Sequence, residues 1–161
     1  MDVFLVNELY GNIYSAKVNG IIPWAIVQTE TWVGGDPNPG TAFRIDGESG
    51  YSLEKGYYYY KQVCRAGQRG MAVASTRSND PEITLIAFAR NSTKHPSALI
   101  VLNLAKEHKK VNIDIEGLEA SQLEGYRTAP EEEYLSLGTF PLQDSITYKA
   151  PARSVTTFYA A

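Results

Sequence analysis

The sequence is poor in the residues that build disulfides, metal sites and membrane spans. It has a single cysteine, Cys64, which excludes an internal disulfide. Its two histidines, His95 and His108, have no cysteine or carboxylate at a ligand spacing, so we expect no metal site and no other cofactor. No apolar run approaches the roughly 18 residues that cross a bilayer. A soluble chain that does not enter membranes is therefore expected.

The sequence also lacks an excess of charge of one sign. Its 15 basic and 18 acidic residues are mixed along the chain and give a formal net charge of -3. Without a basic stripe to attract phosphate groups, nucleic-acid binding is not expected. There is no phosphate-binding loop, dinucleotide fingerprint or Gly-x-Ser-x-Gly motif, which argues against nucleotide chemistry and serine hydrolysis. The first residues lack the order of a signal peptide, so the sequence assigns no localisation.

From residue 71 onward, short apolar runs alternate with Gly, Pro, Asn and Ser breaks about every ten residues, the rhythm of an antiparallel β-sandwich. The alternation of Val111, Ile113 and Ile115 with polar residues predicts a strand with one buried face. Pro151 interrupts the ladder and predicts a corner between the last two strands. The predicted strands are 71–75, 82–90, 98–104, 110–115, 122–128, 133–137, 145–149 and 154–159, of which 82–90 and 98–104 are the most apolar and should be central.

The first part of the chain has a different pattern. Apolar residues over 2–19 recur at nearly helical spacing, which predicts one amphipathic helix capped by Asp2 and ended at Asn19-Gly20. Residues 21–27 form a continuous apolar run, which is typical of a strand buried on both faces of a parallel sheet. Residues 29–50 are rich in Gly and Pro and predict a long functional or mobile loop.

A second helix is predicted over residues 52–66, with Ser52 as its N-cap and Gly67 at its stop position. Cys64 is then expected to be a small buried hydrophobe. Two segments follow from these patterns: a helix-strand-loop-helix segment over 1–68 and a β-sandwich domain over 69–161. The apolar face of the second helix is predicted to consist of Leu53, Tyr57, Tyr60 and Cys64.

Several of these runs resemble, in order, the end of a retaining glycoside hydrolase of the TIM-barrel superfamily, most like family 30. Residues 20–27 (Gly-Ile-Ile-Pro-Trp-Ala-Ile-Val) resemble the eighth barrel strand, 57–63 the last barrel helix, and 150–158 the closing strand of the fused β-sandwich. Residues 83–91 with 99–103 resemble the middle hairpin of that sandwich. The resemblance covers nearly the whole chain but only about the last third of such an enzyme.

The resemblance implies a mainly β fold: an antiparallel β-sandwich of about seven to eight strands, preceded by a helix-strand-helix remnant of a TIM barrel. In that family two carboxylates about 5 Å apart cleave the glycosidic bond. They follow the fourth and seventh barrel strands, which correspond to no part of this sequence. We therefore assign no catalytic residue and do not expect the chain to be an enzyme on its own, although its parent would be a glycoside hydrolase of a usually secreted family.

Aromatic residues are the candidate sugar contacts. Trp24 matches a tryptophan that this superfamily often places at the floor of the sugar site, and Glu30 and Trp32 would lie at the catalytic mouth of a barrel. The alternatives are core packing for Trp24 and a solvated loop for Glu30. The sequence has 11 tyrosines, whose ordinary role is packing between sheets and helices. In the sandwich, the exposed candidates are expected to be Tyr126, Tyr134, Tyr148 and Tyr159.

Three hypotheses remain open at this point. The first is a non-catalytic, glycosidase-associated module that binds a polysaccharide or oligosaccharide or supports a neighbouring domain. The second is a fragment of a retaining glycoside hydrolase that is active only with its N-terminal barrel. The third is an interaction protein, because a lone strand over 21–27 would have two unpaired edges. That strand predicts a homo-oligomer through residues 1–66, unless the segment packs onto its own sandwich.

Overall fold

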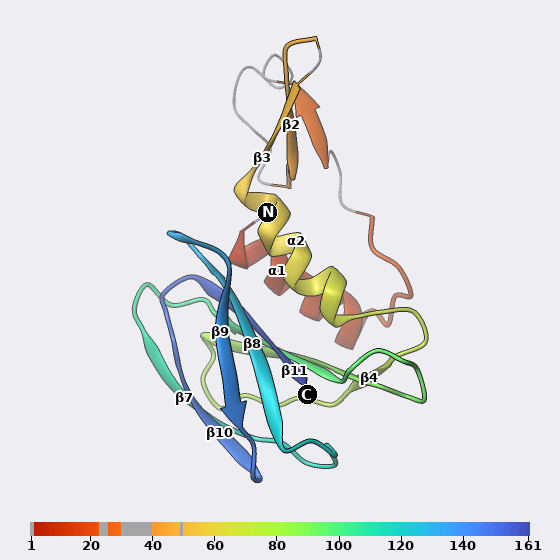
Figure 1. Cartoon of the computed structure of the whole chain (residues 1–161), viewed down its shortest axis with the longest axis vertical. Coiled ribbons are helices and arrows are strands. Elements are labelled where there is room, and N and C mark those ends of the chain that lie inside the picture. Colours follow the sequence, from red (N-terminus) through yellow and green to blue (C-terminus); the bar gives the residue numbers. More distant parts are fainter. Residues whose placement is uncertain (1, 23–25, 30–39, 49) are drawn as a thin grey trace.

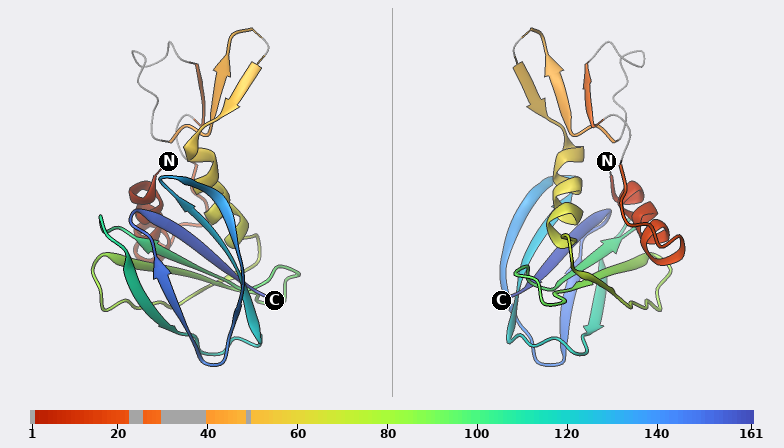
Figure 2. Two further views of the ribbon diagram at one scale, coloured as in Figure 1. Left: turned by 60° about the vertical axis from the view of Figure 1, so that its left-hand side comes forward. Right: turned by 90° about the vertical axis from the view of Figure 1, so that its right-hand side faces the viewer.

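The computed structural model describes residues 2–22, 26–29, 40–48 and 50–161 (Figure 1). Helices α1 and α2 lie on one face of a six-stranded sheet, and a two-stranded sheet lies on its other face (Figures 1 and 2). A small three-stranded sheet projects beyond the helices. The fold is thus mainly β, an antiparallel sandwich preceded by a segment with two helices, as the sequence predicts.

Helix α1 spans Val3–Tyr10 and continues into the π-helix η1, Gly11–Ser15, while α2 spans Lys55–Ala66. No helix in the described ranges has the length and hydropathy that crossing a bilayer requires. The strands are β1 Val27–Thr29, β2 Phe43–Asp46, β3 Gly50–Leu53, β4 Ala72–Ala74, β5 Ile83–Ala89, β6 Ala98–Asn103, β7 Lys109–Asp114, β8 Gln122–Ala129, β9 Glu132–Pro141, β10 Ser145–Ala150 and β11 Ser154–Ala160.

Every strand predicted after residue 70 is present, as β4 to β11. The six-stranded sheet has the order β4-β5-β6-β11-β8-β9 with antiparallel neighbours, and β10 pairs with β7 in the second sheet. β5 and β6 lie inside the sheet, as their apolar sequences predict. The corner at Pro151 is also confirmed, because it joins β10 of one sheet to β11 of the other. The side-chain amide of Asn103 fixes this corner by donating to the carbonyl oxygens of Ala150 (3.1 Å) and Pro151 (2.8 Å).

The central strands of the six-stranded sheet, β6 and β11, are buried on both faces and contribute side chains to two cores. On β6, Ile100 and Leu102 face the helices, whereas Val101 between them faces the second sheet. Phe158 of β11 is fully buried in the sandwich core. Each such side chain contributes about 1.5–3 kcal/mol of burial free energy, so both layers stabilise the sheet. The division into residues 1–68 and 69–161 stays a prediction, because the helices share one core with the sheet.

The start of α1 agrees with the sequence and its end does not. Asp2 caps the helix, because its Oδ1 accepts from the N–H groups of Phe4 (3.0 Å) and Leu5 (3.1 Å). The α-helix stops at Tyr10 and turns into η1 instead of running to Asn19. Tyr14, in this π-helix, makes a tertiary contact with the sheet: its hydroxyl donates to the Ala74 carbonyl (2.8 Å) and accepts from the Ala87 N–H (3.0 Å).

The buried strand predicted over 21–27 is wrong for the residues that the structure describes. Ile22 is 97% exposed, and Ile21 and Val27 are exposed as well. β1 begins only at Val27 and pairs in parallel with β2, so it is not a lone strand either. A continuous apolar run indicates burial only when other layers cover both faces. The predicted 29–50 loop is also wrong in part, because β2 and the start of β3 lie within it.

Helix α2 begins three residues later than predicted. Ser52 belongs to β3 and does not cap the helix, whereas the stop at Gly67 is confirmed. Cys64 is exposed, so its predicted burial is wrong. The predicted apolar face includes Leu53, but Leu53 lies in β3 and not in the helix. The four consecutive tyrosines fit more than one helical phase, so the sequence alone does not select the correct one. The buried face consists of Gly56, Tyr59, Tyr60, Gln62 and Ala66.

Candidate functional site

Three of the predicted aromatic candidates lie together in what we call the tyrosine cluster: Tyr126 of β8, Tyr134 of β9 and Tyr159 of β11. The rings of Tyr126 and Tyr134 stack with centroids 4.9 Å apart and planes at 19°. Tyr159 meets Tyr126 edge to face at 5.9 Å, and the hydroxyls of Tyr134 and Tyr159 are 3.3 Å apart. The adjacency of β11, β8 and β9 in the sheet brings these residues together.

Helix α2 covers the outer side of this cluster with two cations. Lys61 Nζ lies 4.2 Å from the ring centroid of Tyr134, and the guanidinium carbon of Arg65 lies 5.6 Å from it. Such cation–π contacts are worth about 0.5–1 kcal/mol each at exposed sites. Tyr134 is therefore held between Tyr126 and the cations and supports the cluster. Burial, followed by the hydrogen bond with Tyr134, raises the pKa of Tyr159 well above its usual range, so its phenol stays neutral.

A pocket of about 460 Å³ opens beside the cluster. Tyr126 and Tyr159 contribute aromatic surface to it, but Tyr134 does not line it. Its remaining lining offers hydrogen-bond donors and acceptors to hydroxyl groups. An aromatic wall with a few convergent polar groups is the usual composition of a small-ligand site. The polar residues are Arg65, Gln68, His95 and Glu124.

Tyr148 does not join this cluster. Its side chain is 5% exposed and packs in the sandwich core against Phe140 and Phe158, so the expectation of an exposed ring at this position is wrong. The alternation along β10 directs Tyr148 inward, on the same face as Ile146. Its hydroxyl lies 2.8 Å from Thr156 Oγ1.

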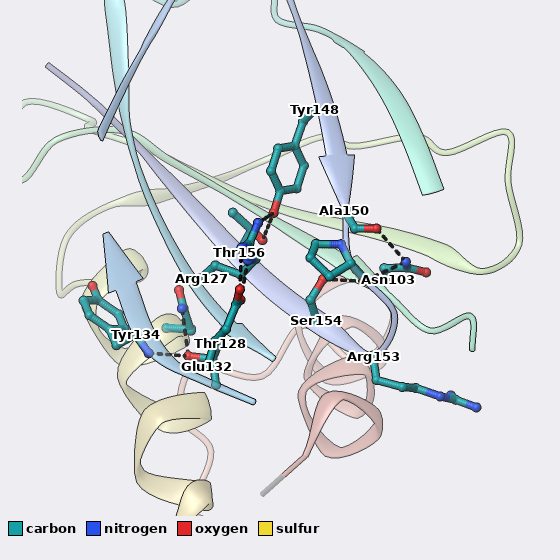
Figure 3. A network of polar contacts seen from close by, with 12 residues as sticks. Asn103, Arg127, Thr128, Glu132, Tyr134, Tyr148, Ala150, Arg153, Ser154 and Thr156 are labelled. Carbon is teal, nitrogen blue, oxygen red and sulfur yellow. Dashed lines mark hydrogen bonds and ion pairs between the residues drawn. The ribbon is translucent and has the colours of Figure 1, made fainter. Parts of the chain in front are cut away.

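An ion pair between Arg127 and Glu132 links β8 to β9, the two strands that carry Tyr126 and Tyr134 (Figure 3). The guanidinium of Arg127 donates from Nε and Nη2 to the two carboxylate oxygens of Glu132, both at 2.5 Å, and from Nη1 to the Tyr148 hydroxyl at 3.3 Å. The bonds to Glu132 raise the pKa of Arg127 above its usual range. Thr128 Oγ1 accepts from the Tyr134 N–H at 3.3 Å. Sequence reasoning missed this network because its partners depend on the hairpin register.

A second surface feature lies on the projecting three-stranded sheet and the segment that leads to it. Large apolar side chains are exposed here, including Ile22 (97%) and Tyr51 (72%). β1 is an edge strand of this sheet, so one of its edges has no partner among the described residues. We call this region the N-terminal apolar surface; it comprises Ile21, Ile22, Ile26, Val27, Ile45, Tyr51 and Leu53.

Trp24, Glu30 and Trp32 lie outside the described residues, and their assignment as sugar contacts stays a prediction. Within the described part, no group of three His, Cys, Asp or Glu side chains is arranged to hold a metal ion.

Two acidic side chains, Asp80 and Glu82, do converge in the described structure. Lys109 Nζ lies 3.1 Å from Asp80 Oδ2 and 2.8 Å from Glu82 Oε2. The hydrogen bond from the Glu82 N–H and then the contact with Lys109 lower the pKa of Asp80. The same carboxylates raise the pKa of Lys109 to about 12. A glycosidase acid needs a raised carboxyl pKa, so Asp80, whose pKa is lowered, does not have the properties of that acid.

No family model matches the sequence, and no curated protein sequence does. Solved structures match the fold. A family 30 subfamily 8 xylanase from Clostridium acetobutylicum aligns with a TM-score of 0.78 and 15% identity over 99% of this chain and 38% of that chain. The catalytic domain of family 30 xylanase C from Talaromyces cellulolyticus gives 0.77 and 16% over 99% and 35%. A family 30 endoxylanase from Clostridium papyrosolvens C71 gives 0.61 and 17% over 67% and 28%.

The chain thus has the fold of the C-terminal portion of family 30 xylanases, which confirms the resemblance at the level of the fold. It spans only 35–38% of the two xylanase chains that it matches over 99% of its own length.

Proposed function

We propose that this chain is a non-catalytic module of a family 30-like glycoside hydrolase and that it supports the catalytic barrel by binding it through the N-terminal apolar surface. The observation that carries the proposal is the distribution of exposed apolar side chains. Most of them lie on the projecting sheet and the segment before it, with Phe4 exposed on α1, whereas the sandwich buries most of its large apolar residues in two cores. Only Val73 and Leu135 are exposed large apolar residues in the described chain after residue 53.

The parallel pairing of β1 with β2 points to a barrel as the partner. Parallel strands are found almost only in sheets whose two faces are both covered, and a barrel closes by pairing such strands edge to edge. Among the described residues one edge of β1 has no partner, and Ile26 and Val27 are exposed at the start of this strand. The solved xylanase chains of this fold have most of their length outside the matched part, which is long enough to form that barrel.

The test is co-expression of this chain with the polypeptide encoded directly upstream of it. We expect a stable complex that hydrolyses xylan, while the chain alone hydrolyses neither xylan nor an aryl glycoside. Ile22→Asp and Tyr51→Asp should each weaken the complex about tenfold or more, because each places a charge in an apolar contact. Val73→Asp, at an exposed apolar residue outside this surface, is the matched control.

Turnover of an aryl glycoside by the purified chain would contradict the proposal. The chain could instead form a dimer that Ile22→Asp disrupts and show no binding to the upstream polypeptide. That result would assign the N-terminal apolar surface to contact with a second copy of the chain.

A second candidate function is carbohydrate binding at the pocket beside the tyrosine cluster. It is favoured by the combination of Tyr126 and Tyr159 with polar side chains around about 460 Å³. Migration in gels containing xylan, β-glucan or cellulose measures such binding. Tyr126→Ala and Tyr159→Ala should abolish any retardation, and Tyr51→Ala should not. Unchanged migration of the parent chain in all three polysaccharides would leave only the support function.

A further inference from the structure

A second pocket adjoins the one beside the tyrosine cluster. Its volume is about 470 Å³, and the two pockets share Pro96, Ala160 and Ala161 as lining residues. Pro96 comes from the connection between β5 and β6, and Ala160 ends β11. We call the pocket beside the tyrosine cluster the first pocket and its neighbour the second pocket. Because they share these residues, a ligand longer than one sugar ring can extend from one pocket into the other.

Each pocket carries charged side chains of both signs that do not pair with each other. In the first pocket these are Arg65 and Glu124, and in the second they are Lys94 and Glu119, together with Arg90. None of the five forms an ion pair with any of the described residues. Each pocket therefore offers separate hydrogen-bond donors and acceptors. A ligand rich in hydroxyl groups satisfies both kinds, because a hydroxyl donates and accepts.

The segment that lines both pockets, residues 90–97, is fixed by hydrogen bonds. The Arg90 N–H donates to Ser97 Oγ (3.0 Å), and the Arg90 guanidinium donates from Nε to the Thr93 carbonyl (2.7 Å). The Asn91 amide donates to the Gly70 carbonyl (3.0 Å), which ties this segment to the chain that follows α2. The walls of both pockets are thus in place before a ligand binds, which lowers the entropic cost of binding.

The two pockets differ in aromatic surface. Tyr126 and Tyr159 line the first pocket, whereas the described lining of the second has no aromatic residue and includes Leu118 as its largest apolar side chain. Aromatic side chains provide a large contact area for a ring. We therefore expect the first pocket to hold a sugar ring by itself. The second pocket adds contacts only for a ligand that already occupies the first.

We propose that the two pockets together bind an extended stretch of a polysaccharide chain. One part of the chain lies against Tyr126 and Tyr159, the chain crosses Pro96, and the next part meets Lys94 and Glu119. The inference deepens the second candidate function and rests on it, because the first pocket must bind a sugar before the second can contribute. Affinity is then set by the length of the chain and not by one sugar ring.

The experiment follows the amide signals of the full chain, labelled with ¹⁵N, during titration with xylobiose and with xylohexaose. Both sugars should shift the signals of Tyr126 and Tyr159, and only xylohexaose should shift those of Lys94 and Glu119. Xylohexaose should bind about tenfold more tightly, because a gain of about 1.4 kcal/mol from the second pocket corresponds to that factor. Cellobiose and cellohexaose give the same comparison for a glucan chain.

Lys94→Ala and Glu119→Ala test the second pocket directly. Each should weaken xylohexaose binding about threefold, the effect of one lost hydrogen bond, and leave xylobiose binding unchanged, because only the longer ligand reaches these side chains. Lys149→Ala, at an exposed residue of β10 that lines neither pocket, is the matched control. Tyr126→Ala should abolish the binding of both ligands.

Equal affinities for the short and the long sugar in both series would overturn the inference, and so would a preference for the long sugar that Lys94→Ala and Glu119→Ala both retain in full. Either result leaves carbohydrate binding at the first pocket in place. Binding of no sugar in either series would defeat that second candidate function as well. Association with the upstream polypeptide is measured separately, so its absence would defeat the proposed support of the barrel without changing these titrations.

Discussion

The N-terminal part of the chain up to Leu53 and the sandwich after residue 70 use apolar residues in opposite ways. In the sandwich, alternation directs apolar side chains into a helix-facing core and a sheet-facing core. In the N-terminal part, α1 buries Val3, Val6 and Leu9, but the projecting sheet exposes its apolar side chains. The sandwich is therefore stabilised by its own contacts. The projecting sheet is as rich in apolar side chains as a core, but the described structure leaves them exposed.

Truncation of a central sandwich residue should have the largest effect and defines one side of this comparison. Phe158 is fully buried and packs against Phe140 and Tyr148 at 5.2 Å. Phe158→Ala should lower the free energy of unfolding by about 3–5 kcal/mol, through lost burial and a residual cavity. Ile22→Ala, at a side chain of similar hydrophobicity, should change it by less than about 0.5 kcal/mol. Urea denaturation measures the free energy of unfolding of both variants. Equal decreases in the two variants would show that the two regions do not differ in their contribution to stability.

Adding one methyl group to a glycine should have opposite signs in the two regions. A Cβ at Gly125 would lie 2.8 Å from the Phe140 ring, whereas one at Gly11 would meet nothing within 4 Å. Gly125→Ala should destabilise the chain by about 1–3 kcal/mol through overpacking. Gly11→Ala should stabilise it by up to about 1 kcal/mol through helix propensity. Thermal denaturation of the two variants gives the comparison, and a stabilised Gly125→Ala would mean that the β8 environment is loosely packed.

The buried amide of Gln62 tests how firmly α2 is fixed to the sheet. It is fully buried and lies 3.0 Å from Thr128 Oγ1 and 2.6 Å from Thr157 Oγ1. Gln62→Ala removes one bond from each hydroxyl, while Thr128 Oγ1 still accepts from the Tyr134 N–H and Thr157 Oγ1 still donates to the main-chain carbonyl of residue 62, so it should cost about 0.5–1.5 kcal/mol per lost bond. Gln68→Ala, near the exposed end of the helix, should cost less. Hydrogen exchange of the α2 amides should rise in the first variant, and unchanged protection would show that the other contacts of the helix hold it without the Gln62 amide.

The smallest expected effect is a pH dependence at the surface pair beside β7. Because the pKa of Asp80 is lowered in the folded chain, its contribution to stability is present above the unfolded pKa, near 4, and is lost as pH falls through the lowered value. Asp80→Asn should therefore flatten the decline of the unfolding midpoint below about pH 4. An identical decline of the midpoint in Asp80→Asn would mean that the pKa of Asp80 is the same in the folded and the unfolded chain.

Much of the fold could be predicted from the sequence, because period-two alternation is a local signal. It located β4 to β11, the corner at Pro151 and the inward face of Ile113. The failures depended on other segments. Cys64 was placed on the wrong face because the four tyrosines fit several helical phases, and Ile22 was predicted to be buried because an apolar run does not show whether another layer covers it. The hairpin of β2 and β3 was missed among glycines and prolines.

The candidate site could be predicted only in part. Tyr126, Tyr134 and Tyr159 were singled out one by one as aromatic residues on strands. Their convergence depends on β8 lying between β9 and β11, and strand order is a long-range property that alternation does not carry. The cations over Tyr134, Lys61 and Arg65, lie on α2. Predicting their contact with Tyr134 therefore also requires the correct helical phase of α2. Among the described residues β7 pairs with β10 alone, and no sequence motif indicates that its other edge has no partner there.

The position of β11 has a consequence for how the molecule is assembled. It is the last strand in the sequence, yet it pairs with β6 on one side and β8 on the other. The widest sheet therefore consists of two blocks, β4 to β6 and β8 to β9, that join only when β11 inserts between them. Pairings between residues this distant in the sequence slow folding. During synthesis the edges of β6 and β8 therefore stay unpaired until β11 has been made.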